Sequence, residues 1–323
     1  MIRIGLLGAS RIAQTAVLAP LGKTDAFVVT AVAARDVARA RAYAEEHGVP
    51  AVADDYAALI RRDDVDIVYN GLPPSGHAEW TVAALEAGKA VLCEKPFALN
   101  AGEAAEMVAA AERTGKLLLE AFHYRHHVVM RRAKAIVDSG VLGRITGGAA
   151  KFAVPIANAP GELRWTASLG GGALMDLGCY SVHALRTLIG AEPQVISAKG
   201  RFVDGVDAEM TADLKFPGGI EARIFSSMVA KEATISSVTL TLTGEAGSLD
   251  IINFIAPQYG SRFTTTIDGV TTEEPVGGPT SYEAQLENLR AVMLDGETPV
   301  TGGRDAIANM TVVDAIYSAS GRG

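Results

Sequence analysis

The stretch MIRIGLLGASRIA, residues 1–13, decides the fold. Its apolar run, Ile2–Leu7, is followed at once by a glycine and then by the start of a helical pattern. In a dinucleotide-binding turn the first glycine makes the tight turn, the second lets backbone approach a pyrophosphate, and the third, often alanine, lets helix pack on strand. Gly8, Ser10 and Ala13 stand at these three positions. The stretch therefore predicts a nucleotide-binding strand–turn–helix unit.

Ser10 departs from the glycine of this pattern, but it is small and its hydroxyl can donate to a phosphate. The free N–H groups and the dipole of the helix that follows favour an anion at the turn. Taken alone, the motif also describes an ordinary tight strand-to-helix connection, so the rest of the chain has to decide between the two. The cofactor-binding residues expected here are Gly8, Ala9, Ser10, Arg11 and Ile12.

The first 122 residues repeat this strand–helix alternation. We expect strands at Ile2–Leu7, Phe27–Ala34, Ile67–Tyr69, Ala90–Cys93 and Leu117–Glu120. We expect helices at Ile12–Leu18, Val37–His47, Tyr56–Arg61, His77–Glu86 and Ala101–Thr114. Apolar strands that alternate with helices are typical of a parallel sheet covered on both faces, and Gly48, Gly88 and Gly115 are placed to end helices. Residues 1–122 are thus predicted to form a Rossmann dinucleotide-binding domain in an α/β protein.

The alternation of single strands and helices ends after residue 122. Between 194 and 272 the pattern is strand after strand, with clear alternation in Met210–Phe216 and turns at Pro217-Gly218-Gly219, Gly244 and Gly269. The other elements expected are a strand at Thr146–Val154 and helices at His126–Ser139, Ala173–Ile189, Tyr282–Leu294 and Asp305–Ser318. We predict an α+β domain over 123–323 with a mostly antiparallel sheet, whose C-terminal helix can pack back on the first domain.

The charge pattern argues against nucleic acid as a partner. The net charge is −8, and no run of lysine and arginine is long enough to neutralise a phosphate backbone. The longest basic cluster, Arg131–Lys134, is better interpreted as the solvated face of a helix.

The cysteines and the apolar segments point to the cytoplasm. Cys93 and Cys179 sit among apolar neighbours without a CxxC pair, which predicts two reduced, buried thiols. We find no basic segment followed by a long apolar one at the start, and no stretch of about 18 apolar residues, so neither a signal peptide nor a membrane span is expected.

The end of the second strand indicates which dinucleotide is bound. An NAD site usually has an acid there that bonds the ribose 2′-hydroxyl. Here Ala34 is followed by Arg35, whose planar guanidinium can grip a 2′-phosphate, and Arg39 lies one helical turn further on. We expect NADP, with NAD as the second choice if the arginines are merely solvated and Asp36 meets the ribose.

A lysine follows another strand, in the turn Cys93-Glu94-Lys95-Pro96. In open parallel sheets the ligand lies outside the carboxyl ends of the strands, so Lys95 could bond a substrate hydroxyl or the ribose, or hold a neighbouring acid ionised. A surface lysine paired with Glu94 explains the spacing equally well.

Five motifs, in matching order along essentially the whole chain, make it resemble the glucose-fructose oxidoreductase / inositol dehydrogenase / rhizopine catabolism (Gfo/Idh/MocA) family. They are GASRIA at 8–13, GLPPSGH at 71–77, CEKP at 93–96, EAFHYRHH at 120–127 and GGGALMDLGCY at 170–180. Within the family the chain looks most like the NADP-dependent branch that holds dimeric dihydrodiol dehydrogenase and D-xylose dehydrogenase. The segments that favour this branch are 33–36, 120–122 and Arg164-Trp165.

The resemblance implies a second domain with a large open-faced sheet that often joins subunits, and hence a homo-oligomer, either a dimer or a tetramer. It implies that Lys95 is the catalytic lysine and that Asp176 and Tyr180 are the acid/base pair. The further cofactor contacts expected are Leu72, Pro73, His77, Glu94, Arg164 and Trp165. A helix cap or structural role for His77 and a plain loop anchor for Trp165 are the alternatives. The candidate substrate contacts are Tyr124, His183 and His123, the last of which departs from many relatives and has no assigned role.

Asp176 and Tyr180 are four residues apart on an expected helix and so share a face. We expect that face to point into a cleft between the domains, where the preceding glycines 170–172 let backbone approach nicotinamide or substrate. Tyr180 would exchange the proton of the substrate hydroxyl, and Lys95 would lower its pKa from the ordinary value of about 10 and polarise the alkoxide. Asp176 would orient substrate or balance Lys95. A structural acid and a packed aromatic are the plain alternatives.

The function expected is NADP-dependent hydride transfer to or from a hydroxyl or carbonyl of a sugar, cyclitol or dihydrodiol. One alternative is a glycoside hydrolase that keeps NAD bound. A second is a non-catalytic dinucleotide sensor, but a sensor does not need the proton-transfer residues Lys95, Asp176 and Tyr180. No metal is expected, because His126 and His127 have no carboxylate at ligand spacing.

Overall fold

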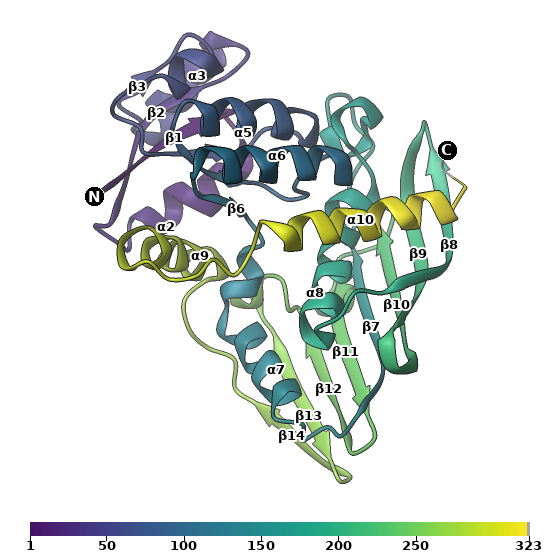
Figure 1. Cartoon of the computed structure of the whole chain (residues 1–323). Helices are drawn as coiled ribbons and strands as arrows, with labels where there is room; N and C mark the ends of the chain where they lie inside the picture. The colour runs from purple at the N-terminus through teal and green to yellow at the C-terminus, as the bar shows by residue number, and fades with distance from the viewer. Residues whose placement is uncertain (322–323) are drawn as a thin grey trace. The chain divides into compact units, whose positions relative to one another are not determined.

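The computed structural model describes residues 1–321; positions 322–323, the last two of the predicted second domain, lie outside the described residues. The described chain divides into two compact units (Figure 1). The first comprises Met1–Phe122 and Tyr282–Ile307, and the second comprises His123–Ser281 and the chain from Ala308 onward. Residues 282–307, which the sequence analysis places in the second domain, therefore belong to the first unit.

The first unit is built on a parallel sheet. Its strands within residues 1–321 are β1 (Ile2–Leu7), β2 (Phe27–Ala33), β3 (Ala51–Val52), β4 (Ile67–Asn70), β5 (Ala90–Cys93) and β6 (Leu118–Glu120). They follow the order β3-β2-β1-β4-β5-β6 and every pairing is parallel. This order, with the first strand in the middle, is that of a Rossmann sheet, and the predicted α/β fold is confirmed.

Helices cover both faces of this sheet (Figure 1). They are α1 (Arg11–Ala13), continued by a π turn, Gln14–Leu18, and α2 (Ala19–Leu21); α3 (Val37–His47); α4 (Tyr56–Ile60); α5 (His77–Glu86); α6 (Ala101–Thr114); and α9 (Ser281–Arg290), continued by a π turn, Ala291–Asp295. On one face Ile4 and Leu6 share a core with Val17 and with Leu286 and Leu289 of α9. These leucines explain why residues 282–307 belong to the first unit.

The second unit contains a larger sheet. Its strands within the described chain are β7 (Ile145–Ala153), β8 (Gln194–Val203), β9 (Val206–Phe216), β10 (Ile220–Ser227), β11 (Val238–Gly244), β12 (Gly247–Ile252), β13 (Arg262–Ile267) and β14 (Val270–Glu274). The order is β14-β13-β12-β11-β7-β10-β9-β8. β7 and β10 run parallel and the other neighbours antiparallel, which confirms the mostly antiparallel sheet that the sequence predicts.

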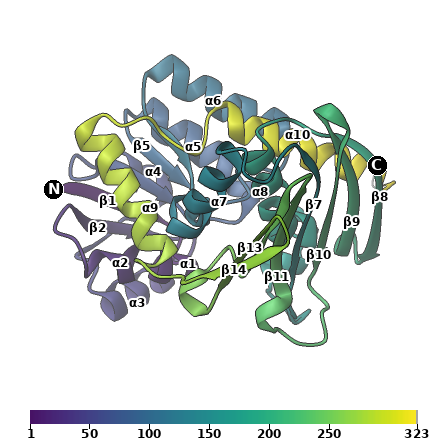
Figure 2. The ribbon, with the colours of Figure 1, turned by 90° about the horizontal axis from the view of Figure 1, so that it is seen from below.

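The two faces of this second sheet differ in chemistry. In β9, Met210, Ala212 and Leu214 are buried, whereas Thr211 and Asp213 between them are partly exposed. Two helices, α7 (Val128–Asp138) and α8 (Cys179–Ile189), belong to this unit, and Figure 2 shows them gathered on one face of the sheet. A third, α10 (Arg304–Ala319), begins in the last residues of the first unit and continues into the second. None of the helices in residues 1–321 has the length and apolar composition needed to cross a membrane.

Candidate active site

The turn after β1 has the geometry of a phosphate cradle. Gly8 has a φ of +92°, and a Cβ added there would lie 3.2 Å from Leu72 and 3.3 Å from the carbonyl of Gly71. Ser10 caps the helix that follows by accepting from the Ala13 N–H at 3.4 Å. A glycine-shaped turn that opens onto a helix N-terminus fits the pyrophosphate of a dinucleotide.

The loop after β4 lies against this turn. A Cβ added to Gly71 would lie 2.8 Å from the Ser10 hydroxyl, so the two motifs are packed together. His77 is fully buried, with Nδ1 2.9 Å from the Pro96 carbonyl and Nε2 2.8 Å from the Leu72 carbonyl. Burial lowers its pKa. The His77 ring ties the 71–77 loop, which carries Leu72 and Pro73, to the turn at Pro96, and its contact with the cofactor stays a prediction.

The tip of β2 separates the two cofactor choices. Asp36 caps α3, its Oδ1 accepting from the Ala38 N–H at 2.8 Å and the Arg39 N–H at 3.3 Å. Arg35 and Arg39 are exposed, and Arg39 Nη2 donates to the Ala9 carbonyl at 2.8 Å, directly over the phosphate turn. Because Asp36 is held by its own helix, the arginines are the groups presented at this edge.

Glu94 and Lys95 follow β5, as the sequence predicts for the edge of the sheet where ligands bind. Glu94 is buried, and its Oε1 accepts from the Tyr69 hydroxyl at 2.8 Å while Oε2 accepts from the Lys95 N–H at 3.2 Å. The pKa of Tyr69 is raised well above its ordinary value, first by burial and then by the Glu94 charge. The Lys95 side chain is half-buried, and the Lys95–Pro96 bond is cis.

Asp176 lies on a π turn, Leu174–Gly178, that leads into α8. The sequence predicts one continuous helix over these residues, and the wider π turn is a difference of a kind often found at functional sites. Arg164 Nε donates to Asp176 Oδ2 at 2.8 Å, and Arg164 Nη1 donates to Glu162 Oε1 at 3.0 Å. The Asp176 charge is the main reason that the pKa of Arg164 is raised.

Local contacts hold the loop before this turn in place, and the expected cofactor contact of Trp165 and the approach of the glycine backbone to nicotinamide or substrate stay predictions. Trp165, expected at the cofactor, donates its indole N–H to the Ile156 carbonyl at 2.9 Å and packs on a core cluster of the second unit, so it anchors the loop. The glycines also serve local packing. A Cβ on Gly171 would lie 2.6 Å from the Arg164 carbonyl, and one on Gly172 would lie 2.1 Å from Asp207 Oδ1.

Tyr180 sits on α8 in a cluster of buried aromatic rings. Its ring is edge-on to those of His123, Tyr124 and Phe152. Its hydroxyl lies 3.2 Å from His123 Nε2, and the Tyr124 hydroxyl lies 2.5 Å from His183 Nδ1. Tyr124 and His183 are fully buried, so the structure makes them the inner layer of this cluster, behind Tyr180.

The histidines before α7 differ from the helix expected at 126–139. His123–His126 form a 3₁₀ turn, His127 caps α7, and the helix begins at Val128. Burial, with help from Arg125 and His183, lowers the pKa of His126 to about 3. Within residues 1–321 no group of histidine, cysteine and acidic side chains is placed to hold a metal ion.

Among the predicted catalytic residues, Lys95 belongs to the first unit, and Asp176 and Tyr180 belong to the second. Two residues of the site are not predicted from the sequence: Tyr69, which bonds Glu94, and Ser281, which bonds His123. Tyr69 looks like a core aromatic at a strand end, and Ser281 like a residue that begins a helix. Neither carries a signal of its own, because each acts through a partner far away in the chain.

Comparison with known proteins assigns both parts of the chain. Residues 2–122 match the family described as an oxidoreductase family with an NAD-binding Rossmann fold, and residues 130–250 match the Gfo/Idh/MocA C-terminal domain. The chain is 33% identical over 320 residues to D-xylose 1-dehydrogenase (NADP⁺) 2 of Haloferax volcanii, covering 99% of this chain and 97% of that protein. It is 34% identical over 256 residues to trans-1,2-dihydrobenzene-1,2-diol dehydrogenase of Sus scrofa, covering 78% of this chain and 74% of that protein.

A solved structure agrees with these matches. The crystal structure of a 3-ketoreductase from Actinomadura kijaniata with NADP and TDP-benzene superposes with a TM-score of 0.88 at 30% identity, over 98% of this chain and 97% of that one. The phosphate turn, the Glu-Lys-Pro turn and the Asp-x-x-x-Tyr helix thus stand in a chain that matches such proteins from end to end. The protein belongs to the Gfo/Idh/MocA family of oxidoreductases.

Proposed function

We propose that this protein is an NADP-dependent dehydrogenase or reductase that acts on a hydroxyl or carbonyl group of a sugar, cyclitol or dihydrodiol. The observation that carries the proposal is the likeness over 99% of the chain to an NADP-dependent D-xylose dehydrogenase. The NADP-bound ketoreductase supports the same cofactor. The names of the diol dehydrogenase and the ketoreductase support the same kind of reacting group, a carbon that bears a hydroxyl or a carbonyl oxygen.

The first unit offers the groups that NADP requires. The Gly8 turn and the Ser10 cap form the cradle for the pyrophosphate. Arg35 and Arg39 supply two cations for the 2′-phosphate, and Arg39 is already held over the turn by the Ala9 carbonyl. The bound nicotinamide supplies the site that accepts or donates a hydride.

Three side chains transfer the proton of the substrate hydroxyl, stabilise the charge that develops on its oxygen and orient the substrate. Tyr180 exchanges the proton with the substrate oxygen, and the Lys95 ammonium stabilises negative charge that develops on that oxygen. Asp176 orients the substrate hydroxyls as a carboxylate, since the Arg164 guanidinium beside it favours its charged form.

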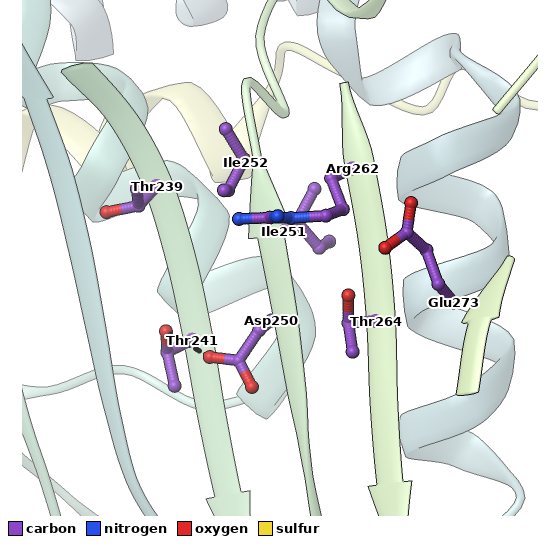
Figure 3. Close-up of a pocket in the computed structure, with 8 residues that line it drawn as sticks. All are labelled: Thr239, Thr241, Asp250, Ile251, Ile252, Arg262, Thr264 and Glu273. Carbon is purple, nitrogen blue, oxygen red and sulfur yellow. Dashed lines mark hydrogen bonds between the residues drawn. The ribbon is translucent and has the colours of Figure 1, made fainter. Parts of the chain in front are cut away.

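We further propose that two copies of the chain pair through the outward face of the second sheet, in the cytoplasm. A hollow of about 470 Å³ lies on that face over β11 to β14 (Figure 3). Threonine and charged side chains line it, and Thr241 donates to Asp250 at 2.8 Å. Sedimentation of wild-type protein and of Thr241→Arg tests the pairing: the variant should be monomeric, and an unchanged assembly argues against this interface. The two buried thiols, Cys93 and Cys179, suit a reducing compartment.

The activity is tested by absorbance at 340 nm. Purified protein is incubated with D-xylose, D-glucose, myo-inositol and trans-1,2-dihydrobenzene-1,2-diol, each with NADP⁺ and with NAD⁺. We expect reduction of NADP⁺ by at least one of these compounds and a higher kcat/KM for NADP⁺ than for NAD⁺. Tight NADP⁺ binding without turnover on this panel, and without reverse reaction on the matching carbonyls, contradicts the proposal.

A further inference from the structure

A chain of hydrogen bonds runs from the Tyr180 hydroxyl into the interior of the second unit. His123 Nε2 lies 3.2 Å from the Tyr180 hydroxyl, and His123 Nδ1 lies 2.9 Å from Ser281 Oγ. Ser281 Oγ in turn lies 3.3 Å from Gln258 Oε1. The imidazole is thus held at both nitrogens by side chains of two different segments, and a third segment holds Ser281.

The bonding pattern decides where the protons are. The backbone N–H of Ser281 donates to the same Gln258 Oε1 at 3.3 Å, which marks that atom as the amide oxygen, an acceptor only. The single hydroxyl proton of Ser281 is donated to this oxygen, so the hydroxyl accepts from His123. The imidazole proton therefore sits on Nδ1, and Nε2 presents a lone pair to which the Tyr180 hydroxyl donates.

We propose that His123 is a positioning residue that takes up the phenolic proton of Tyr180 while the substrate is oxidised. This inference rests on the proposed function. The substrate carbon loses a hydride to the nicotinamide, its hydroxyl proton passes to the Tyr180 oxygen, and the proton that Tyr180 held passes to His123 Nε2. The substrate leaves as a carbonyl compound and His123 remains as an imidazolium. In reduction the same protons travel back.

This relay, the chain Tyr180–His123–Ser281–Gln258, solves a problem of acidity. A phenol has an ordinary pKa of about 10 and an imidazole about 6.5, so a neutral imidazole is a better proton acceptor near neutral pH than a phenol that must first ionise. Because the Tyr180 hydroxyl donates to His123, its oxygen acts as an acceptor towards the substrate hydroxyl. Ser281 keeps Nε2 free of a proton and so keeps the relay in the accepting state.

Burial protects the relay from water. Tyr180 is 4% exposed, His123 3% and Ser281 0%. Among the ionisable groups packed round the pair are Tyr124, edge-on to the Tyr180 ring, and His183, which bonds Tyr124. On the turn that carries His123, Arg125 is a fixed cation, and the lowered pKa of His126 keeps that ring neutral above about pH 3.

The tautomer is the first test, and it needs neither cofactor nor substrate. Long-range ¹H–¹⁵N spectra of the cofactor-free protein resolve the ring nitrogens of its six histidines. His123 is identified by the signal that is lost in His123→Gln. We expect the proton on Nδ1 in wild-type protein and a loss of this preference in Ser281→Ala. A proton on Nε2 in wild-type protein overturns the relay.

The second test separates positioning from proton uptake. His123→Gln keeps a hydrogen-bonding group near the place of Nε2 but has no basic nitrogen. With D-xylose and trans-1,2-dihydrobenzene-1,2-diol as probes and NADP⁺, we expect kcat at pH 7 to fall on the order of 10²-fold. The loss should shrink as the pH rises, because the phenolic proton is then removed more easily without a basic side chain. Tyr317→Phe, which removes a 2.7 Å bond to Asp207 in the same unit, is the matched control and should keep the wild-type pH profile.

The outcomes distinguish the relay from the proposed function. If Tyr180→Phe is inactive and His123→Gln has the wild-type rate and pH profile, the proposed function stands and the relay is overturned. If Tyr180→Phe keeps full turnover, the assignment of Tyr180 fails and the relay fails with it. An inactive Tyr180→Phe, an Nδ1 proton and a kcat that recovers with pH in His123→Gln together support the relay.

Discussion

Arg164 and Asp176 form an ion pair that fastens the loop after β7 to the π turn before α8, with 2.8 Å between Arg164 Nε and Asp176 Oδ2. Twelve residues separate them in the chain. Both side chains are partly shielded from solvent, at 33% and 16% exposure. Removal of one partner should therefore cost more stability than at a surface salt bridge and less than at a fully buried one.

Removal of either partner should destabilise the protein. We expect Arg164→Met and Asp176→Leu each to lower the free energy of unfolding by about 1–2 kcal/mol, because each leaves a partly desolvated charge without its counter-ion. The double variant should lose less than the sum of the two, as measured by urea titration. Additive losses would show that the pair is not coupled.

Loss of the proposed catalytic groups should reduce turnover and spare the cofactor. Lys95→Met and Tyr180→Phe are each expected to lower kcat by about 10²–10⁴-fold, because general acid–base and charge-stabilising groups contribute on that scale. NADP binding, followed by titration calorimetry, should change little. Lys116→Met and Tyr259→Phe alter an exposed lysine and an exposed tyrosine and serve as matched controls. Full turnover in either catalytic variant contradicts its assigned role.

The choice of cofactor should depend on Arg35 and not on the acid beside it. Arg35→Ala should raise the Kd of NADP by about 10- to 100-fold and leave that of NAD nearly unchanged, since a charge-assisted bond to phosphate is lost. Asp36→Asn keeps an oxygen that caps α3 and should change neither constant. A tenfold rise in the Kd of NAD in Asp36→Asn would place this acid on the ribose instead.

Gly172 tests whether crowding within the second unit explains the glycine run. Its φ is +142°, and an added Cβ would lie 2.1 Å from Asp207 Oδ1. The other oxygen of this carboxylate, Oδ2, accepts from the Leu174 N–H at 2.7 Å. Gly172→Ala should cost about 3 kcal/mol or more of unfolding free energy. Gly161→Ala is the control: its φ is +81° and nothing lies within 4 Å, so only backbone strain of about 1–2 kcal/mol is expected. Equal losses would show that crowding is unimportant.

His126 makes the free energy of unfolding depend on pH. Its pKa in the folded protein is about 3, below the ordinary 6.5 of an unfolded chain, so the unfolded state binds more protons between these values. The stability it contributes is complete above pH 6.5 and is lost as the pH falls towards 3, by about 1.4 kcal/mol per pH unit. His126→Gln should be less sensitive to acid by about 2 kcal/mol at pH 5, in urea titrations referred to pH 8. An unchanged slope against pH contradicts this account.

Much of the fold could be predicted because it depends on local patterns. The strand β1, the turn at Gly8 and the helix stop at Gly48, with its φ of +68°, each carry their own signal in neighbouring residues. The strand β3 was missed because two residues, Ala51–Val52, are too few to show a period. The π turn Leu174–Gly178 also escaped prediction, because it occupies a sequence whose apolar pattern suits an ordinary helix.

The candidate site could be predicted only as far as its motifs extend. Lys95, Asp176 and Tyr180 stand in recognisable segments, whereas the partner of His123, Ser281, lies 158 residues away in the chain. Nor does the sequence near Trp165 show that its indole is bonded to the Ile156 carbonyl. Such pairings are set by tertiary packing, which local periodicity does not encode.

The membership of α9 in the first unit has a consequence for synthesis on the ribosome. The core of that unit is incomplete until Leu286 and Leu289 have been made, although its sheet is finished at Glu120. More than half of the polypeptide must therefore emerge before the nucleotide-binding unit can close, and the second sheet is translated in the meantime. The unit that contains the first residues of the chain therefore completes its core only after residues near the C-terminal end have been synthesised.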